Sequence, residues 1–446
     1  MRNENPTQIP DIIPADAHDM CNYVAKYHMA NFQIQTIMRL DGRLDFNKLV
    51  EAVRLSIDSE PVLGCRFIKL DSPYWRPFDD IDHINLCSIE ETDNPDEAIQ
   101  RFLQSPLDMD KDPVVKIKLI RSEYDTLGIK INHACCDAAG AREYILLLSD
   151  IYSRISNGED VFILKPSIRS KKDHEKLLSA FSEKNSGKPW STRKQIAFPT
   201  WNFPWKNMKI GSTRFVFSSL PYGHFDVMKS YGKARNATVN DLILTAVYRA
   251  MFEISKPPYG LPMDIPVTID LRKYLPDHKA EAIRNLSGGI VMRLARKAGE
   301  PFEDTLSRVM SLTKIMKEGH PSKENLLRAE RIEKMNFYQI CAYFKTTSQF
   351  IDMLSHNPFY VVGKCSPILS NFGYISKSLI EFGDKVVTDA YIAPPIVRPP
   401  GIILVASTYN GIITLGAGYY KPSVRKADME RLINKIRDEL VKGCTE

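Results

Sequence analysis

The chain has 446 residues, of which 43% are hydrophobic and 26% charged, so it can build a sizeable core and is too long for one small domain. Its formal net charge of +6 is small for this length. That excess gives no sign of a nucleic-acid partner, but it is compatible with an acidic ligand or an acidic carrier protein.

Eight cysteines are present, and no two of them form a CxxC pair. This spacing predicts neither a zinc site nor a disulfide framework, so we expect free thiols and no bound metal. No run of 18 apolar residues occurs, and residues 1–20 lack the apolar stretch of a signal peptide. We therefore expect a cytoplasmic chain without a transmembrane segment.

The first part of the chain alternates between predicted strands and helices. The predicted strands are 30–45, 61–70, 113–121 and 126–132, the last two forming a hairpin. The predicted helices are one capped near Asp45, one at 94–104 with Asn94 as N-cap, and one from Ala138 that stops at Asn157-Gly158.

Residues 159 to about 210 are polar, basic and broken by Pro and Gly, which is typical of a linker. Strands and helices then resume, with strands at 213–221, 264–272 and 287–295, helices at 237–254, 302–319, 322–353 and 425–441, and a hairpin at 401–420 turning at Asn410-Gly411. This mixture predicts an α/β protein of two lobes, with boundaries at 1–165, 166–210 for the linker, and 211–446.

His133 lies where the predicted strand 126–132 ends, in the stretch "INHACCDAAG", and Asp137 follows four residues later. A histidine held on a rigid strand end can face a cleft and accept a proton from a hydroxyl or an amine. Asp137 is positioned to cap the helix that begins at Ala138. The pattern predicts acid–base chemistry, but a buried structural histidine with an ordinary N-cap gives the same letters.

Cys135 and Cys136 permit a rival hypothesis, in which His133 activates a cysteine nucleophile. Adjacent residues on a tight turn rarely point toward each other, and a free cysteine is more often a small buried apolar residue. No glycine-rich phosphate loop, GxSxG or HExxH motif is present.

Several separated segments together resemble one superfamily. "NHACCDAAG" (132–140) resembles the HHxxxDG motif of nonribosomal-peptide condensation domains, which are related to chloramphenicol acetyltransferase, polyketide-associated acyltransferases, wax-ester synthases and alcohol acetyltransferases. Five later segments resemble parts of the second lobe of these enzymes, in the same order: "ATVNDLILTAVYRA" (237–250), "IPVTIDLRKYLP" (265–276), "NLSGGI" (285–290), "LSNFGYI" (369–375) and "STYNGIITLGAGYY" (407–420).

The resemblance implies two pseudo-symmetric chloramphenicol acetyltransferase-like lobes with a substrate tunnel between them. It implies that His133 is the general base, that Asp137 is structural, and that Arg272 pairs with Asp137. It also suggests Asn371, with Asn132 and Gly140, as contacts to the substrate or to the oxyanion. Cys135 and Cys136 fall at the variable positions of the motif, which implies that they are packing residues.

Two departures from the motif are visible, because Asn132 replaces its first His and Ala138 replaces its Gly. We expect an acyltransferase that moves an acyl group from a CoA or carrier-protein thioester to a hydroxyl or amine acceptor, with the thioester as co-substrate and no covalently bound cofactor. We expect a free acyltransferase, because no carrier or adenylation domain is attached. The alternative is a non-catalytic condensation-like protein that binds carriers or acts as a scaffold.

Overall fold

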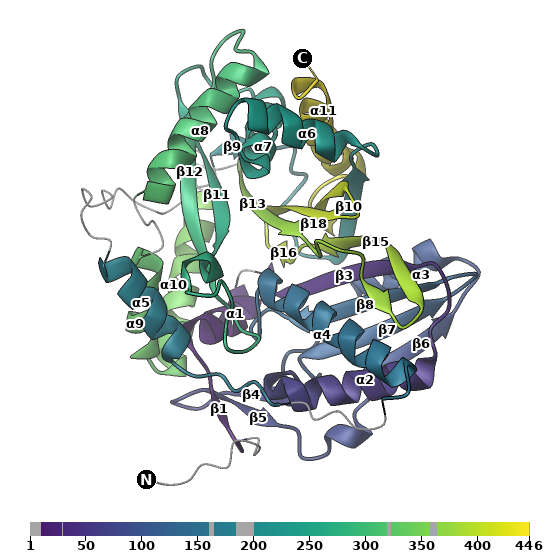
Figure 1. Cartoon of the computed structure of the whole chain (residues 1–446). Helices are drawn as coiled ribbons and strands as arrows, with labels where there is room; N and C mark the ends of the chain where they lie inside the picture. The colour runs from purple at the N-terminus through teal and green to yellow at the C-terminus, as the bar shows by residue number, and fades with distance from the viewer. Residues whose placement is uncertain are drawn as a thin grey trace.

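Two mixed β-sheets with helices against them form the two halves of the protein (Figure 1). The computed structural model describes residues 10–28, 30–159, 165–183, 200–318, 323–356 and 364–445. The first sheet has the strand order β14-β15-β3-β8-β7-β6, and these strands span Glu381–Phe382, Lys385–Ala393, Gln33–Leu40, Asp125–Asn132, Val115–Arg121 and Cys87–Glu91.

The first sheet is covered on both faces, as the alternation along β3 shows. Ile34, Met38 and Leu40 join the core that contains α2 (Phe46–Ser59) and α4 (Ala138–Ser156). Ile37 instead joins a smaller cluster with α3 (Pro95–Gln104). Successive side chains of a strand point to opposite faces, so the helices α2 and α4 lie on one face and α3 on the other.

The second sheet has the order β10-β18-β17-β13-β11-β12, and the short strand β9 pairs with β13. These strands span Ser212–Ser219, Ile412–Lys421, Gly401–Tyr409, Lys364–Tyr374, Pro262–Asp270, Ser287–Ala295 and Trp201–Asn202. Helices α6 (His224–Ala234), α7 (Val239–Ser255), α8 (Phe302–Glu318) and α11 (Lys426–Gly443) lie with this sheet (Figure 1), and their buried side chains share its core.

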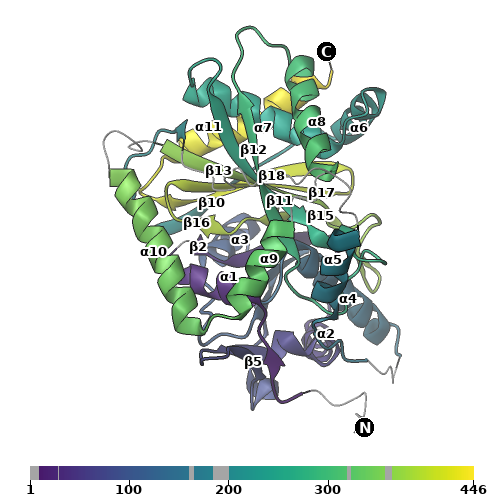
Figure 2. The same ribbon diagram turned by 90° about the vertical axis from the view of Figure 1, so that its left-hand side faces the viewer.

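Segments from the second half of the sequence pack against the first half. Helix α1 (Ala17–His28) contacts α9 (Lys323–Glu333) and α10 (Phe337–His356), and the three lie together in Figure 2. Ala329, Ile332, Phe337 and Ile340 of these helices belong to the core of the first lobe.

The remaining elements are short. Strands β1 (Ile13–Pro14), β5 (Tyr74–Pro77) and β4 (Cys65–Ile68) form one small sheet, and β2 (Ala30–Asn31) pairs with β16 (Ile396–Val397). The others are the helix α5 (Lys172–Glu183) and the 3-10 turns η1 (Pro61–Gly64), η2 (Ile81–His83) and η3 (Leu271–Tyr274).

Most predicted elements occur within two residues of their expected positions, but two predictions were wrong. The single helix expected at 322–353 is two helices, because α10 starts with its own cap, in which the side chains of Asn336 and Gln339 each accept from the other's backbone N–H at 2.9 Å. The strand expected at 61–70 begins only at Cys65, since residues 61–64 form the turn η1 with Pro at its first position.

The predicted lobe boundaries stay a prediction, and two findings bear on them. Strand β15 falls inside the range 211–446, yet it pairs with β3 in the first sheet. The range 166–210, expected as a linker, contains the helix α5 and the buried Arg169. The chain therefore crosses between the lobes more than once, which a division by sequence range does not capture.

Candidate active site

His133 follows directly on β8, where the strand pairs with β3. Its backbone N–H donates to the carbonyl of Phe32 at 2.9 Å, and this bond continues the ladder past the last strand residue. The ring of Phe32 stands edge-on to the imidazole, with 5.5 Å between the ring centroids. The backbone of His133 and one flank of its imidazole are therefore held by Phe32, the residue that precedes β3.

Two asparagines hold the other side of His133. The Asn22 side-chain nitrogen lies 3.1 Å from the His133 carbonyl, 3.2 Å from the Asn285 side-chain oxygen and 3.4 Å from His133 Nδ1. This nitrogen has only two hydrogens, and the two shorter contacts use both. Nδ1 can therefore keep its own proton, which leaves Nε2 unprotonated in the neutral ring and able to accept one.

Burial lowers the pKa of His133 below its ordinary value of 6.5, although a hydrogen bond to its own backbone, the charge of Asp137 and a contact with Asn285 act in the opposite direction. Desolvation disfavours the charged imidazolium. The ring is thus neutral at pH 7, the state that a general base requires.

Asp137 is the N-cap of α4, as predicted, and it is almost fully paired. Its Oδ1 accepts from the Gly140 N–H at 2.9 Å, and its Oδ2 accepts from the Leu286 N–H at 2.7 Å. Arg272 Nη1 donates to both oxygens, at 3.0 and 2.9 Å. Burial alone would raise the pKa of Asp137, but Arg272 and the two amides outweigh it, so the pKa lies below its ordinary value.

Arg272 contacts Asp137 as predicted, but it does not use two parallel N–H groups. One nitrogen spans both carboxylate oxygens, Nη2 donates to the Arg284 carbonyl at 2.8 Å, and Nε lies 3.1 Å from Glu143 without hydrogen-bond geometry. Asp270 lies 3.4 Å from Nη1. The guanidinium, whose side chain is 2% exposed, is thus shared among three carboxylates and one carbonyl.

A second buried arginine, missed by sequence reasoning, holds the same loop. Arg169 donates from Nε to the Ile283 carbonyl at 2.8 Å, from Nη1 to Asp19 at 2.9 Å, and from Nη2 to the Cys135 carbonyl. Asn285 also bridges this region, since its amide nitrogen lies 3.1 Å from the His133 carbonyl and 2.9 Å from the Ala134 carbonyl. The loop that follows His133 is fixed through its backbone as well as through Asp137.

Cys135 and Cys136 are fully buried in the core of the first lobe. Burial raises the pKa of the Cys135 thiol to about 12 and that of Cys136 well above its ordinary value. A thiol is nucleophilic only as the thiolate. Neither side chain therefore has the surroundings of a cysteine nucleophile.

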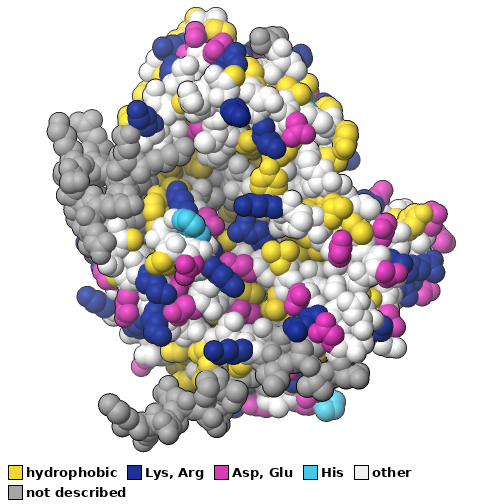
Figure 3. Space-filling model, in the orientation of Figure 1, with side chains coloured by type: hydrophobic (Ala, Val, Ile, Leu, Met, Phe, Trp, Pro, Cys, Tyr) yellow, Lys and Arg dark blue, Asp and Glu magenta, His cyan; other side chains and the backbone are white. Residues whose placement is uncertain are grey.

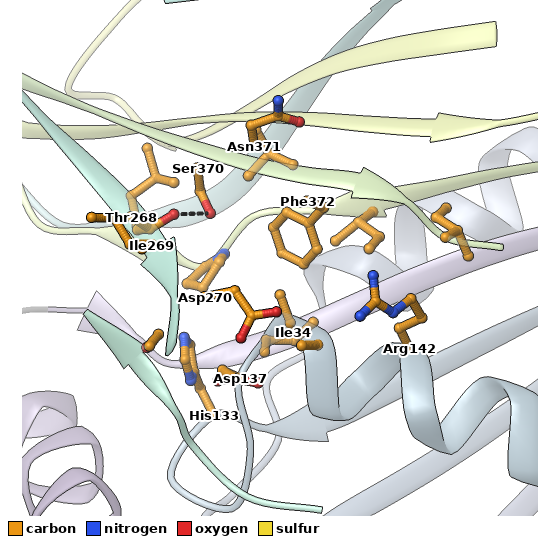
Figure 4. Close-up of a pocket in the computed structure, with 18 of the residues that line it drawn as sticks. Ile34, His133, Asp137, Arg142, Thr268, Ile269, Asp270, Ser370, Asn371 and Phe372 are labelled. Carbon is orange, nitrogen blue, oxygen red and sulfur yellow. Dashed lines mark hydrogen bonds between the residues drawn. The ribbon is translucent and has the colours of Figure 1, made fainter. Parts of the chain in front are cut away.

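A pocket of about 140 Å³ reaches His133 between the two lobes (Figure 4). Residues of β3, α4, β11, β13, β15 and β17 line it, so both sheets contribute. Most of the other lining residues are aliphatic, and Phe372 adds an aromatic ring. The polar lining residues are His133, Asp137, Arg142, Thr268, Asp270, Ser287, Ser370, Asn371 and Tyr374.

The three predicted substrate contacts lie in different surroundings. Asn371 lines the pocket, but its amide bonds to Asn240 at 3.3 Å and to the Gly373 N–H at 2.9 Å, and it points away from His133 in Figure 4. Among the described residues, Asn132 and Gly140 do not line this pocket, and their contact with a substrate stays a prediction. Asn132 is buried and accepts from the Ala134 N–H at 2.8 Å, and Gly140 packs against the Cys136 side chain and the Arg284 carbonyl, where a side chain would clash.

Ser370, the residue before Asn371, also lines the pocket. Strand alternation turns Ser370 and Phe372 to the face opposite Asn371, and in Figure 4 the Ser370 hydroxyl lies between Asn371 and His133. Thr268 Oγ1 donates to Ser370 Oγ at 3.0 Å. The Ser370 proton therefore stays free to be donated into the pocket.

In the described part of the chain, no group of three or more His, Cys, Asp or Glu side chains is arranged to hold a metal ion. None of the described helices combines the length and the apolar character needed to cross a membrane.

Comparison with solved structures finds the same fold over almost the whole chain. Polyketide synthase associated protein 5 from Mycobacterium tuberculosis aligns with a TM-score of 0.66 and 14% identity over 98% of this chain and 100% of that one. The first condensation domain of the CDA synthetase gives 0.66 and 14% over 98% of both chains. TRI3 trichothecene 15-O-acetyltransferase from Fusarium sporotrichioides gives 0.68 and 12% over 96% of this chain and 95% of that one.

None of the curated proteins matches the chain in sequence. The family model of the condensation domain, by contrast, matches residues 25–256, which is more than half of the chain and includes His133 and Asp137. This match supports an acyltransferase-like or condensation-like function. The two-lobed structure, the loop after β8 and this match together show that the chain belongs to the condensation domain family.

Proposed function

We propose that the protein transfers an acyl group from a thioester, on CoA or on a carrier protein, to a hydroxyl or an amine, with His133 as the general base. The observation that carries this proposal is the neutral imidazole of His133 at a pocket lined by both lobes. The two substrates meet in that pocket, so proximity supplies much of the rate.

The chemistry requires only groups already described. His133 Nε2 takes the proton of the acceptor hydroxyl or amine as the acceptor oxygen or nitrogen attacks the thioester carbonyl carbon. Ser370 donates its free hydrogen to the oxyanion of the tetrahedral intermediate. The intermediate then collapses, the C–S bond breaks, and the imidazolium returns its proton to the departing thiolate, which regenerates neutral His133.

Asp137 takes no part in proton transfer in this scheme. Both of its oxygens are occupied by Arg272, Gly140 and Leu286, and its pKa lies below the ordinary value. It orients the loop between β8 and α4. No acyl-enzyme is needed, and the two buried cysteines are poor candidates for one.

The alternative, a non-catalytic carrier-binding protein, requires no neutral histidine in the lining of a pocket between the lobes. The pocket at His133 and the hydroxyl pair of Thr268 and Ser370 favour catalysis over that alternative.

A thiol-release assay tests the proposal. The full chain is incubated with acyl-CoA thioesters of rising chain length, with and without pooled alcohols and amines, and free thiol is followed by a chromogenic disulfide. We expect acceptor-dependent release that is lost in His133→Ala and kept in His83→Ala, a control at an exposed histidine outside the site. Release that is equal in wild type and His133→Ala would refute the assignment, and acceptor-independent release would indicate a hydrolase.

A further inference from the structure

Arg142 places a positive charge in the same pocket as His133. It lies on α4 four residues after Ala138, and both side chains line the pocket, as residues one helical turn apart do. In Figure 4, His133 and Asp270 lie at one end of the group of lining residues and Arg142 at the other, with Ile34 and Phe372 between them.

Arg142 differs from the buried arginines in its partners. Its Nη1 donates to the Tyr374 carbonyl at 3.4 Å. Within the described part of the chain, no carboxylate oxygen lies within 4.0 Å of its guanidinium, whereas Arg272 has three carboxylates within that distance. A guanidinium that lines a pocket without a carboxylate partner is suited to a planar anion, which its N–H groups can bind in pairs.

The opposite charge lies at the His133 end. Asp270 Oδ1 accepts from the Arg272 N–H at 3.0 Å and lies 3.4 Å from Arg272 Nη1, and its side chain is 45% exposed. A negatively charged group on a substrate is therefore attracted by Arg142 and repelled by Asp270. Both charges favour the orientation of the substrate in which this group lies far from His133. A few polar groups that fix orientation in an otherwise apolar pocket are typical of ligand sites.

The space between the two ends limits the spacer. The whole pocket has a volume of about 140 Å³, and Ile34 and Phe372 lie between its two ends (Figure 4). An apolar cavity of about 150 Å³ holds a benzene molecule, so the space fits roughly three to six carbons. On the face shown in Figure 3, Lys or Arg and hydrophobic side chains lie side by side where the two lobes meet.

We propose that Arg142 binds a carboxylate carried by one of the two substrates, separated from the reacting carbon, oxygen or nitrogen by a short aliphatic chain. This inference rests on the proposed function. The carboxylate comes either from a dicarboxylic acyl group or from an amino or hydroxy acid acceptor, and the chemistry at Arg142 is the same in both cases.

The test compares carboxylated substrates with substrates of equal length that lack the carboxylate. In the donor arm, S-glutaryl and S-pentanoyl N-acetylcysteamine are offered with pooled acceptors. In the acceptor arm, 4-aminobutanoate is compared with butylamine, and 4-hydroxybutanoate with butanol. We expect kcat/KM to favour the carboxylated member in one arm by about 10- to 100-fold, mainly through KM.

Arg142→Gln should remove that preference and Arg142→Lys should keep part of it, whereas Arg154→Gln, on the same helix but outside the pocket, should keep all of it. In Arg142→Gln the loss of kcat/KM should be larger for the carboxylated substrate than for its counterpart without the carboxylate. A preference that survives Arg142→Gln, or no preference in either arm, would overturn the inference. The arm that shows the preference identifies the source of the carboxylate.

A binding measurement separates this inference from the proposed function. Thermal stabilisation of the full chain is measured with glutaryl and pentanoyl N-acetylcysteamine and with 4-aminobutanoate and butylamine, for wild type and Arg142→Gln. Stabilisation by a carboxylated compound that is lost in Arg142→Gln supports the anion site even if no acyl transfer is detected. Equal stabilisation of both proteins by every compound overturns it, whether or not transfer occurs.

Discussion

Two buried arginines hold the loop after His133 from two sides, and they do so by different means. Arg272 pairs with Asp137, a side chain of the loop itself. Arg169 donates to the backbone carbonyl of Cys135 and pairs with Asp19, which lies on α1. Their other donors reach adjacent carbonyls, those of Arg284 and Ile283. The segment of Ile283 and Arg284 is thus held between the two arginines, and Asn285, which follows it, contacts the backbone of His133.

The comparison shows why one arginine was predicted and the other was not. The partner of Arg272 is the carboxylate of Asp137, which lies in a recognisable motif, so the pairing could be inferred from the identities of the two residues. Arg169 contacts two carbonyls, which every residue possesses, and a carboxylate about 150 positions away in the chain. It also lies in a polar stretch whose composition predicted a linker. A side chain that binds backbone leaves no matching residue type to detect.

The largest expected effect lies between the two arginines, at His133. His133→Ala should lower kcat/KM by about 10²- to 10⁴-fold, the usual share of a general base. Because neither Arg272 nor Arg169 contacts the imidazole, the loop should keep its shape and the free energy of unfolding should change by less than about 1 kcal/mol. The measurements are the thiol-release rate and chemical denaturation. A large loss of stability would show that the imidazole, and not the arginines, holds the loop.

Removing Arg272 should have the next largest effect. Arg272→Ala leaves the buried Asp137 without its cation, and stranding one partner of a buried pair typically costs about 3–5 kcal/mol. Asp137→Ala should also destabilise, and the double variant should lose less than the sum of the two, because the second removal strands nothing new. Chemical denaturation of the four proteins gives the coupling energy. Additive losses would contradict the pairing as a source of stability.

Arg169→Met should cost less, about 1–3 kcal/mol, the range for buried polar groups left without a partner. Asp19 keeps a hydrogen bond from the Trp75 ring at 2.8 Å. Burial and the neighbouring Asp16 raise the pKa of Asp19 to about 7, so this carboxyl can take up a proton when its cation is removed. Equilibrium unfolding at pH 7 measures the loss, with Arg154→Met as a control on a partly exposed arginine. A loss of unfolding free energy as large as that of Arg272→Ala would mean that the two arginines contribute equally to stability.

Much of the fold was predictable because its signals are local. The hairpin β7–β8, the cap of α4 at Asp137 and the turn at Asn410-Gly411 each depend on residues close together in the sequence. Pairing of β15 with β3 joins residues about 350 positions apart, and no local pattern specifies such a contact. Helix α1, which was not predicted, shows a related limit, because it packs against α9 and α10 from the other half of the chain as well as against the first lobe.

The candidate site was predictable in part for the same reason. His133, Asp137 and Arg272 lie in motifs, whereas Asn22 reaches His133 only through the packing of α1 in the first lobe. Ser370 reaches the pocket only when the second lobe packs against the first. Asn371 was expected to face the substrate because it lies in a recognisable segment. Both Asn371 and Ser370 line the pocket, but adjacent strand positions point to opposite faces, and Figure 4 places the Ser370 hydroxyl between Asn371 and His133.

The smallest effect, the dependence of these losses on pH, separates the two arginines most directly. A carboxyl with a raised pKa in the folded state binds its proton more tightly there than in the unfolded chain. The stability that Asp19 contributes is therefore present below its ordinary value of 3.8 and lost as the pH rises through about 7. Without Arg169 the ionised form of Asp19 is even less favourable in the folded state. The loss of unfolding free energy in Arg169→Met should therefore grow from pH 6 to pH 8, by roughly 1 kcal/mol, about what a pKa shift of one unit contributes.

Asp137 behaves oppositely, because its lowered pKa keeps it ionised and paired in wild type throughout this range. The stability that it contributes is lost only as the pH falls below 3.8. Arg272→Ala should thus remain the more damaging change at both pH values. Equilibrium unfolding of wild type and both variants at pH 6 and pH 8 gives the two differences. A deficit of Arg169→Met that is unchanged, or larger at pH 6, would show that Asp19 does not take up the proton.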